Sequence, residues 1–383
     1  MATAHSSTDT WDIFCKVVDN YGDAGVCWRL ARMLAAEHQL RVRLWIDNPA
    51  ALQALHPGLD VSRTEQQADG VTVINWNARI PDPDGAAVIV EAFGCGLPDT
   101  YVAAMAAREQ PPLWIVLEYL SGEAWVDEHH GLASPHPRLP LPRYFFFPGF
   151  TAASGGLLRE RDLLQRRDAF GSEQRQAFWR RLGFNSPDAQ TLKLSLFCYD
   201  DAPVAGLFDA MAEGNAPVVV AVPAGSAMSA VDAYFGKSGS SAKSRLRGSL
   251  EVRCLPFLPQ VEYDELLWAC DLNFVRGEDS FVRAQWAARP LVWQPYRQYG
   301  GAHQRKMEAF LDRYSAGLES RSRTSLMALW RAWNGEDDVA PAWRDMRPAL
   351  PGLGAHAGRW AAHLAGFRDL ATQLVGFTRD RVK

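Results

Sequence analysis

The sequence of 383 residues lacks long apolar runs and an N-terminal targeting signal. No stretch reaches the roughly eighteen apolar residues of a membrane-spanning helix, and the first ten residues contain neither a basic nor an apolar segment. The formal net charge is only −4, so the chain has no general attraction for nucleic acid or an anionic membrane. We therefore expect a cytoplasmic protein that uses neither nucleic acid nor membrane as a partner.

Motifs for metals and common cofactors are also missing. The six cysteines are scattered without a C-x-x-C pair, and His129, His130 and His136 lack zinc-site spacing. The D-x-D pattern at residues 82–85 lies in a proline- and glycine-containing turn with no strand directly before it, which favours a turn over a metal site. No nucleophile elbow, G-x-S-x-G, supports a serine hydrolase. The sequence predicts reduced core cysteines, no metal site and no cofactor.

What is present is the composition of a globular protein, with 48% hydrophobic and 22% charged residues. The length suits two domains of roughly 100 to 200 residues each. In the first half, short apolar runs alternate with helical patterns, which is typical of a parallel α/β sheet. Strands are expected at residues 11–17, 41–47, 70–76, 86–93 and 112–120. Residues 129–150 are so rich in proline that we expect a long loop there.

A second α/β series follows an arginine-rich helical segment at residues 157–183. Its expected strands lie at residues 191–199, 216–223, 250–258, 270–276 and 289–296. We predict an α/β protein with two Rossmann-like domains of parallel sheet. The first domain should span residues 1–185 and the second residues 186–356, with a C-terminal helix at about 357–383 packing back on the first.

Three polar side chains lie in the turn VVDNYGDAGV, residues 17–26, between a predicted strand and a predicted helix: Asp19, Asn20 and Asp23. Ligands of open α/β sheets bind outside the carboxyl ends of the strands, where this turn falls. The turn lacks the G-x-G-x-x-G pattern, which argues against a nicotinamide-dependent oxidoreductase. Helix capping is the alternative explanation, but two carboxylates and an amide exceed what one cap uses. We interpret the turn as part of a functional site.

A second candidate site lies in NFVRGEDSFVRAQWAARP, residues 273–290. A strand should end at Arg276, and Ser280 should cap a helix that runs to about Arg289. Because a helix N-terminus offers free amides and partial positive charge, it suits a phosphate, and Arg276 would add a cation for a diphosphate. The alternative is that Glu278 and Asp279 only satisfy the helix dipole.

The segment from Phe257 to Gln260 strengthens the functional interpretation of this second site. It lies at the end of a predicted strand of the same domain and could hold a flat base by stacking.

With both sites in view, the chain resembles the protein-arginine rhamnosyltransferases that modify bacterial translation elongation factor P, the EarP family. The resemblance extends from about residue 13 to residue 287. It is carried by IFCKVVDNYGDAGVCWRLAR, RVRLWID, LEYLSGE, GFTAASGGLLRERD, LPFLPQ and RGEDSFVRAQWA.

The resemblance implies a GT-B glycosyltransferase with two Rossmann-like domains facing across a cleft. The donor would be dTDP-β-L-rhamnose, bound by the C-terminal domain. The acceptor would be an arginine side chain of elongation factor P, bound by the N-terminal domain. Transfer in the family inverts the anomeric carbon, needs no metal and activates the elongation factor.

The resemblance also assigns roles to individual residues. Asp23 matches the family's general base and Glu278 its second essential carboxylate. Asp19, which we group with the catalytic carboxylates, and Asn20 match residues that line the sugar site. The remaining matches concern the nucleotide: Arg276, Asp279 and Ser280 at the donor phosphates, Phe257 and Gln260 at the base, and Tyr199 beside the diphosphate.

Two alternatives remain open at this point. One is a GT-B enzyme with a different sugar or acceptor. The other is a non-catalytic module that binds the translation factor, against which the presence of Asp23 and Glu278 argues.

Overall fold

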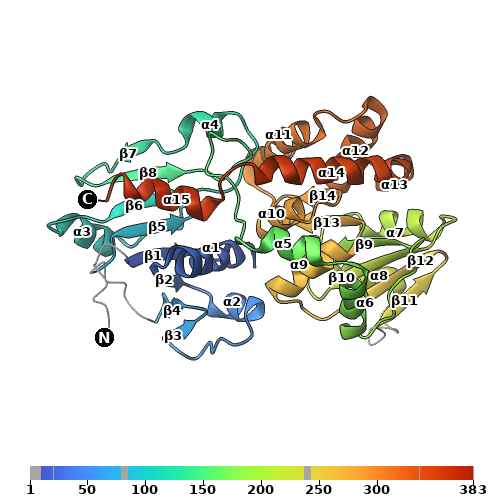
Figure 1. Ribbon diagram of the computed structural model, residues 1–383, viewed down its shortest axis with the longest axis horizontal. Coiled ribbons are helices and arrows are strands. Elements are labelled where there is room, and N and C mark those ends of the chain that lie inside the picture. Colours follow the sequence, from blue (N-terminus) through green and yellow to red (C-terminus); the bar gives the residue numbers. More distant parts are fainter. Residues whose placement is uncertain (1–9, 20, 79–84, 237–242, 336, 383) are drawn as a thin grey trace. The chain divides into compact units, whose positions relative to one another are not determined.

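The computed structural model describes residues 10–19, 21–78, 85–236, 243–335 and 337–382 (Figure 1). The chain divides into two compact units. Unit 1 contains the chain up to Arg161 together with the segment from Gly366 onward, and unit 2 contains Asp162–Ala365. The divisions predicted from the sequence are at residues 185/186 and 356/357.

Unit 1 is built on an eight-stranded sheet with the order β3-β4-β2-β1-β5-β6-β8-β7. Its strands are β1 (Thr10–Cys15), β2 (Arg41–Ile46), β3 (Glu65–Ala68), β4 (Val71–Asn75), β5 (Val88–Ala92), β6 (Leu113–Leu117), β7 (Ala133–Pro135) and β8 (Pro142–Phe146). The strands β4, β2, β1, β5, β6 and β8 pair in parallel, whereas β3 and β7 are antiparallel edge strands. The parallel strands follow the doubly wound order, in which the chain reverses direction across the sheet between β1 and β5.

Unit 1 also contains helices, and its central strand, β1, is buried at every residue. The helices are α1 (Gly22–His38), α2 (Pro49–Leu55), α3 (Asp99–Ala107), α4 (Trp125–His129) and α15 (Leu370–Arg379). The last of these comes from the far end of the chain and packs against α1 (Figure 1). Its backbone is tied to the unit by the hydrogen bond from Leu370 N to Leu157 O, 3.0 Å long.

The expectation of a long loop at residues 129–150 is wrong, because β7 and β8 lie there. Pro142 is the first residue of β8 and Pro135 the last residue of β7, positions at which a missing N–H is tolerated. The aromatic run that follows Pro142 then pairs in parallel with β6. Proline content alone therefore gave no indication of these two strands.

Unit 2 contains a six-stranded sheet with the order β11-β12-β10-β9-β13-β14. Its strands are β9 (Leu192–Leu196), β10 (Val218–Pro223), β11 (Ser244–Arg247), β12 (Leu250–Leu255), β13 (Leu272–Arg276) and β14 (Leu291–Gln294). All pairs are parallel except that of the edge strand β11 with β12. Here the chain reverses direction across the sheet between β9 and β13.

The helices of unit 2 include most of the arginine-rich segment and most of the C-terminal region. They are α5 (Leu163–Ala169), α6 (Ser172–Arg181), α7 (Val204–Ala212), α8 (Ala227–Phe235), α9 (Gln260–Ala269), α10 (Asp279–Trp286), α11 (Ala302–Ser315), α12 (Ser320–Trp333), α13 (Val339–Met346) and α14 (Leu350–Ala365), with 3-10 turns η3 (Tyr299–Gly301) and η4 (Arg347–Ala349). Trp360 on α14 donates to Gln285 Oε1 on α10 at 2.7 Å. The helix α14 thus belongs to unit 2, and the segment from Gly366 onward returns to unit 1.

The prediction of an α/β fold with two Rossmann-like sheets is confirmed, with antiparallel strands added at three sheet edges. The six cysteines are free thiols, and four of them are buried. Among the helices of the described residues, none has both the length and the apolarity that crossing a membrane requires.

Candidate functional site

In unit 1 the candidate site forms where β1 ends and α1 begins. Asp23 lies in the first turn of α1, which starts at Gly22. Its Oδ2 accepts hydrogen bonds from the backbone N of Val18 at 2.7 Å and of Asp19 at 2.9 Å. The Asp23 carboxylate therefore closes the turn that precedes the helix.

Burial makes the Asp23 carboxylate unusual, since its residue is only 2% exposed. Loss of hydration raises the pKa of Asp23 above its ordinary value, and the nearby negative charge of Asp47 raises it further. The amides of Asp19 and Val18 and the hydroxyl of Tyr119 lower this pKa and offset part of the rise. A buried carboxylate with a raised pKa takes up a proton more readily than an exposed aspartate does.

Asp19 lies beside Asp23 and is 8% exposed. Its backbone O accepts from Gly22 N at 2.7 Å, and its side-chain Oδ2 is 2.9 Å from where a Cβ of residue 22 would lie. Glycine at position 22 thus allows the aspartate to approach the helix closely. Asn20, the third predicted polar residue of this turn, lies outside the residues that the structure describes, as do residues 82–84 of the D-x-D pattern.

This site also contains two aromatic residues that the sequence did not indicate. The hydroxyl of Tyr119, just after β6, donates to Asp23 Oδ1 at 3.3 Å. Phe93, just after β5, stacks on the Tyr119 ring with a centroid separation of 4.4 Å and an interplanar angle of 15°. Both lie just past the carboxyl ends of the observed strands β5 and β6, the edge at which ligands of open α/β sheets bind. The predicted strands at residues 86–93 and 112–120 instead placed both residues inside the sheet.

In unit 2 the candidate site forms around Arg276, the last residue of β13, which is 5% exposed. Its Nη1 donates to Cys198 O at 3.2 Å and to Ser226 Oγ at 2.5 Å. The guanidinium also lies over the rings of Phe197 and Tyr199, 4.4 and 4.5 Å from their centroids. The predicted pair of Arg276 and Tyr199 is thus brought together, and Phe197 and Ser226 are additional residues that the sequence did not indicate.

Ser280 has a different structural role from the one expected. It is the second residue of α10, not the residue that precedes the helix, and Glu278 takes that position. Ser280 Oγ accepts from Arg276 N at 3.1 Å and donates to Arg276 O at 2.5 Å, so it joins the helix to the end of β13. Gly277 makes the turn between them with φ of 61°, a conformation that glycine adopts readily.

The far end of α10 also differs from the prediction. The helix ends at Trp286 instead of about Arg289, and Ala288 then adopts a left-handed conformation with φ of 53°.

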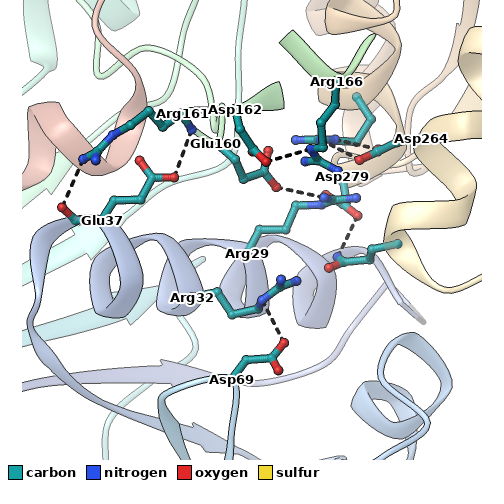
Figure 2. A network of polar contacts seen from close by, with 12 residues as sticks. Arg29, Arg32, Glu37, Asp69, Glu160, Arg161, Asp162, Arg166, Asp264 and Asp279 are labelled. Atoms are coloured by element: carbon teal, nitrogen blue, oxygen red, sulfur yellow. Dashed lines mark hydrogen bonds and ion pairs between the residues drawn. The ribbon is translucent and has the colours of Figure 1, made fainter. Parts of the chain in front are cut away.

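The N-termini of α9 and α10 meet at this site. Gln260, the first residue of α9, donates from Nε2 to Asp279 Oδ2 at 3.1 Å (Figure 2). Glu278 and Phe257 are half-buried, the latter in the turn between β12 and α9. Two helix N-termini and an arginine concentrate positive potential, which suits a diphosphate.

A buried ion pair fixes α10 against α9. Arg283 Nε and Nη2 donate to the two oxygens of Asp264 at 2.8 and 2.6 Å, and the two side chains are 1% and 2% exposed. Such a two-point contact of a guanidinium with a carboxylate fixes the relative orientation of the two helices.

In unit 1, α1 is held by Glu160 and Arg161. Figure 2 shows the Arg29–Glu160 ion pair, 3.0 Å long, and the hydrogen bond from Arg161 N to Glu37 Oε1, also 3.0 Å long. The end of the segment GFTAASGGLLRERD, which carries part of the family resemblance, therefore helps to hold α1 in place.

The predicted residues form two sets, one in each unit. Unit 1 brings Asp19 and Asp23 together, whereas unit 2 brings together Tyr199, Gln260, Arg276, Glu278, Asp279 and Ser280. Within the described ranges of the chain, no group of three or more His, Cys, Asp or Glu side chains could hold a metal ion.

Comparison with known proteins identifies the family to which such a site belongs. The family described as Elongation-Factor P (EF-P) rhamnosyltransferase EarP matches residues 11–379. A protein-arginine rhamnosyltransferase of Pseudomonas putida is 48% identical over 374 residues, which are 97% of this chain and 99% of that protein. A protein of the same name from Neisseria meningitidis is 32% identical over 388 residues, covering 97% of each chain.

Solved structures agree with the fold. One solved structure is described as showing the structural basis for EarP-mediated arginine glycosylation of translation elongation factor EF-P. It matches with a TM-score of 0.70 and 39% identity, covering 97% of this chain and 99% of that one. A glycosyltransferase from Rickettsia africae has a TM-score of 0.53 at 8% identity, covering 97% of each chain, and supports the fold alone. The two doubly wound sheets have the GT-B architecture. The chain therefore belongs to the EarP family of elongation-factor-P rhamnosyltransferases.

Proposed function

We propose that this protein transfers rhamnose from dTDP-β-L-rhamnose to an arginine side chain of translation elongation factor P. The single observation that carries the proposal is the buried Asp23 carboxylate, whose pKa is raised, in a chain of this family. The relatives named as protein-arginine rhamnosyltransferases and the solved structure of arginine glycosylation support the acceptor and the sugar.

An arginine acceptor explains why a carboxylate is needed. A guanidinium has a pKa above about 12 and delocalised lone pairs, so it is a poor nucleophile. In the proposed step, an arginine nitrogen forms a bond to the anomeric carbon while the bond from that carbon to the diphosphate oxygen breaks. The proton leaves the nitrogen for Asp23, which acts as general base. A single displacement inverts the anomeric carbon and needs no enzyme nucleophile.

The residues of unit 2 suit the leaving nucleotide. The cationic Arg276 and the amides of α10 would stabilise the negative charge that develops on the diphosphate. Asp279 and Ser280 would contact the phosphates, and Tyr199 would lie beside them. These groups can stabilise the leaving diphosphate without a metal, so we propose metal-independent transfer.

The remaining predicted residues contact the base, the sugar and the guanidinium. Phe257 and Gln260 would contact the base. We propose that Glu278 orients or polarises the guanidinium, and that Asp19 and Asn20 line the sugar. The reaction would take place in the cytoplasm, with elongation factor P and the nucleotide sugar as partners.

The configuration of the product and the need for metal test the chemistry of this proposal. Elongation factor P is incubated with this protein and dTDP-β-L-rhamnose, with and without EDTA, and the anomeric configuration of the arginine-linked sugar is determined by NMR. We expect an α-linked rhamnose in both conditions. Retention of the β configuration would contradict the inverting step, and loss of activity with EDTA would contradict metal-independent transfer.

Two controls accompany this experiment. One measures transfer from other nucleotide sugars, and the other measures binding of the elongation factor in the absence of transfer. Faster transfer from another nucleotide sugar would favour an enzyme with a different donor. Tight binding of the elongation factor with no transfer from any donor would favour a non-catalytic module.

A further inference from the structure

The two oxygens of Asp23 have different surroundings. Oδ2 accepts from the amides of Val18 and Asp19, at 2.7 and 2.9 Å, and Oδ1 receives the Tyr119 hydroxyl at 3.3 Å. A carboxylate oxygen offers about two lone-pair positions, and the two amides occupy those of Oδ2. A proton is therefore best taken up at Oδ1, the oxygen that Tyr119 contacts.

Tyr119 is itself held by an unusual neighbour. Phe93 stacks on its ring at 4.4 Å, and the Phe93 backbone has φ of 59°, in the left-handed region that few non-glycine residues adopt. Phe93 N also donates to Leu117 O at 2.6 Å, which ties it to the end of β6, two residues before Tyr119. The next residue, Gly94, has nearly the same φ of 60°, which glycine adopts without strain. At position 93 the backbone strain is tolerated and an aromatic ring is placed against Tyr119.

We propose that Tyr119 is a positioning residue that orients Asp23 Oδ1 for proton transfer, and that Phe93 holds Tyr119 in place. The inference rests on the proposed function of Asp23 as the general base. It adds two residues, from the ends of β5 and β6, to a catalytic turn formed by β1 and α1.

The other ionisable groups near Asp23 define what a titration would report. They are Asp19 in the same turn, Asp47 after β2 and Cys27 on α1. Burial raises the pKa of the Cys27 thiol well above its ordinary value, so this thiol is neutral near pH 7. The Tyr119 hydrogen bond lowers the pKa of Asp23, and its removal should raise that pKa.

The test compares Tyr119→Phe with Tyr144→Phe, which removes a tyrosine hydroxyl of the same unit on β8. For Tyr119→Phe we expect kcat of rhamnosyl transfer to fall about tenfold, as for one lost hydrogen bond to a charged group, with little change in the KM for the acceptor. The acid limb of its pH profile should move to higher pH. Phe93→Gly keeps a permitted backbone and should change kcat in the same direction. Tyr144→Phe should match the wild type.

A second measurement does not depend on transfer. The Asp23 carboxyl is titrated by NMR in protein labelled with ¹³C-aspartate, and its signal is assigned by its absence from Asp23→Asn. We expect a higher midpoint in Tyr119→Phe than in the wild type. An unchanged midpoint and pH profile, or equal changes in Tyr144→Phe, would overturn the positioning role. Absence of transfer by the wild type would instead contradict the proposed function. The titration would still show whether the Tyr119 hydroxyl interacts with the Asp23 carboxyl.

Discussion

At the scale of single residues, Asp23 combines two demands that oppose each other. As the proposed general base, its carboxylate must be charged at neutral pH. Its position in the turn before α1 buries it, and burial disfavours the charged form. Above the raised folded-state pKa, the charged carboxylate costs folding free energy. Below the ordinary value of 3.8, the carboxyl is protonated in both the folded and the unfolded state, so this cost disappears. The site thus reduces stability in the pH range where it can act as a base.

We therefore expect Asp23→Asn to unfold at a higher temperature than the wild type at pH 8. The gain should be roughly 1 kcal/mol, typical of stabilising substitutions, and should shrink as the pH falls toward 4. Thermal unfolding monitored by circular dichroism at several pH values measures it. Asp69→Asn is the control, because Asp69 is exposed in a surface ion pair with Arg32 (Figure 2), and its loss should change stability by less than about 1 kcal/mol. An Asp23→Asn variant less stable than the wild type at pH 8 would contradict this account.

The sequence allowed part of the residue-level site to be predicted. Asp19 and Asp23 were identifiable because two carboxylates in one turn after a strand exceed the needs of a helix cap. Tyr119 was not, because it lies 96 residues from Asp23 in the sequence and meets it only through the pairing of β1, β5 and β6. Contacts made by sheet neighbours cannot be identified from a local pattern.

At the scale of elements, the orientation of α10 determines the geometry of the nucleotide site. Its first turn carries Asp279 and Ser280, and its second turn is joined to α9 by the buried ion pair of Arg283 and Asp264. A change in this pair should therefore affect both stability and donor binding.

Arg283→Met should destabilise the protein by about 3 to 5 kcal/mol, because it leaves the Asp264 carboxylate buried without its guanidinium. The double variant Arg283→Met, Asp264→Leu should recover most of the loss, since both charges are then removed. Urea denaturation of the three proteins measures the effect. The exposed pair of Arg344 and Glu213 offers a matched comparison, and Arg344→Met should cost less than about 1 kcal/mol. Equal losses at the two arginines would show that burial of the pair is unimportant.

The elements themselves were predicted unevenly. The buried parallel strands are apolar runs that the sequence displays directly, whereas the edge strands β3 (EQQA) and β11 (SRLR) are short and polar. An edge strand buries little surface, so hydrophobicity does not reveal it, and its pairing is set by the neighbouring strand.

At the scale of the whole molecule, the chain leaves unit 1 at Arg161 and returns to it at Gly366. The return depends on a close backbone approach in unit 1. Gly156 has φ of 72°, and a Cβ at this position would lie 2.4 Å from the backbone O of Arg368. Only glycine satisfies both the backbone conformation and the contact.

Gly156→Ala should accordingly destabilise unit 1 by about 3 kcal/mol, from the left-handed backbone and the steric overlap together. Gly317→Ala separates the two causes, because Gly317 has φ of 80° and nothing within 4 Å of the added Cβ, and it should cost only about 1 kcal/mol. Thermal unfolding and limited proteolysis of the C-terminal segment compare them. If the two variants behave alike, the close approach to Arg368 does not matter for the return of the chain.

The division of the chain was harder to predict than its sheets. The helices α5 and α6 lie between the two α/β series, and their sequence carries no mark of the unit to which they pack. In the structure α6 contacts α9, and the arginine-rich segment belongs to unit 2 from Asp162 onward.

The most direct test of the central claim is the mass of intact elongation factor P after incubation with this protein and dTDP-β-L-rhamnose. The account predicts a gain of one deoxyhexose, mapped by fragmentation to an arginine, and loss of that gain with Asp23→Asn and with Glu278→Gln. A gain that survives Asp23→Asn would contradict the assignment of the base. No gain with wild-type protein that is folded and binds dTDP would contradict the proposed donor or acceptor.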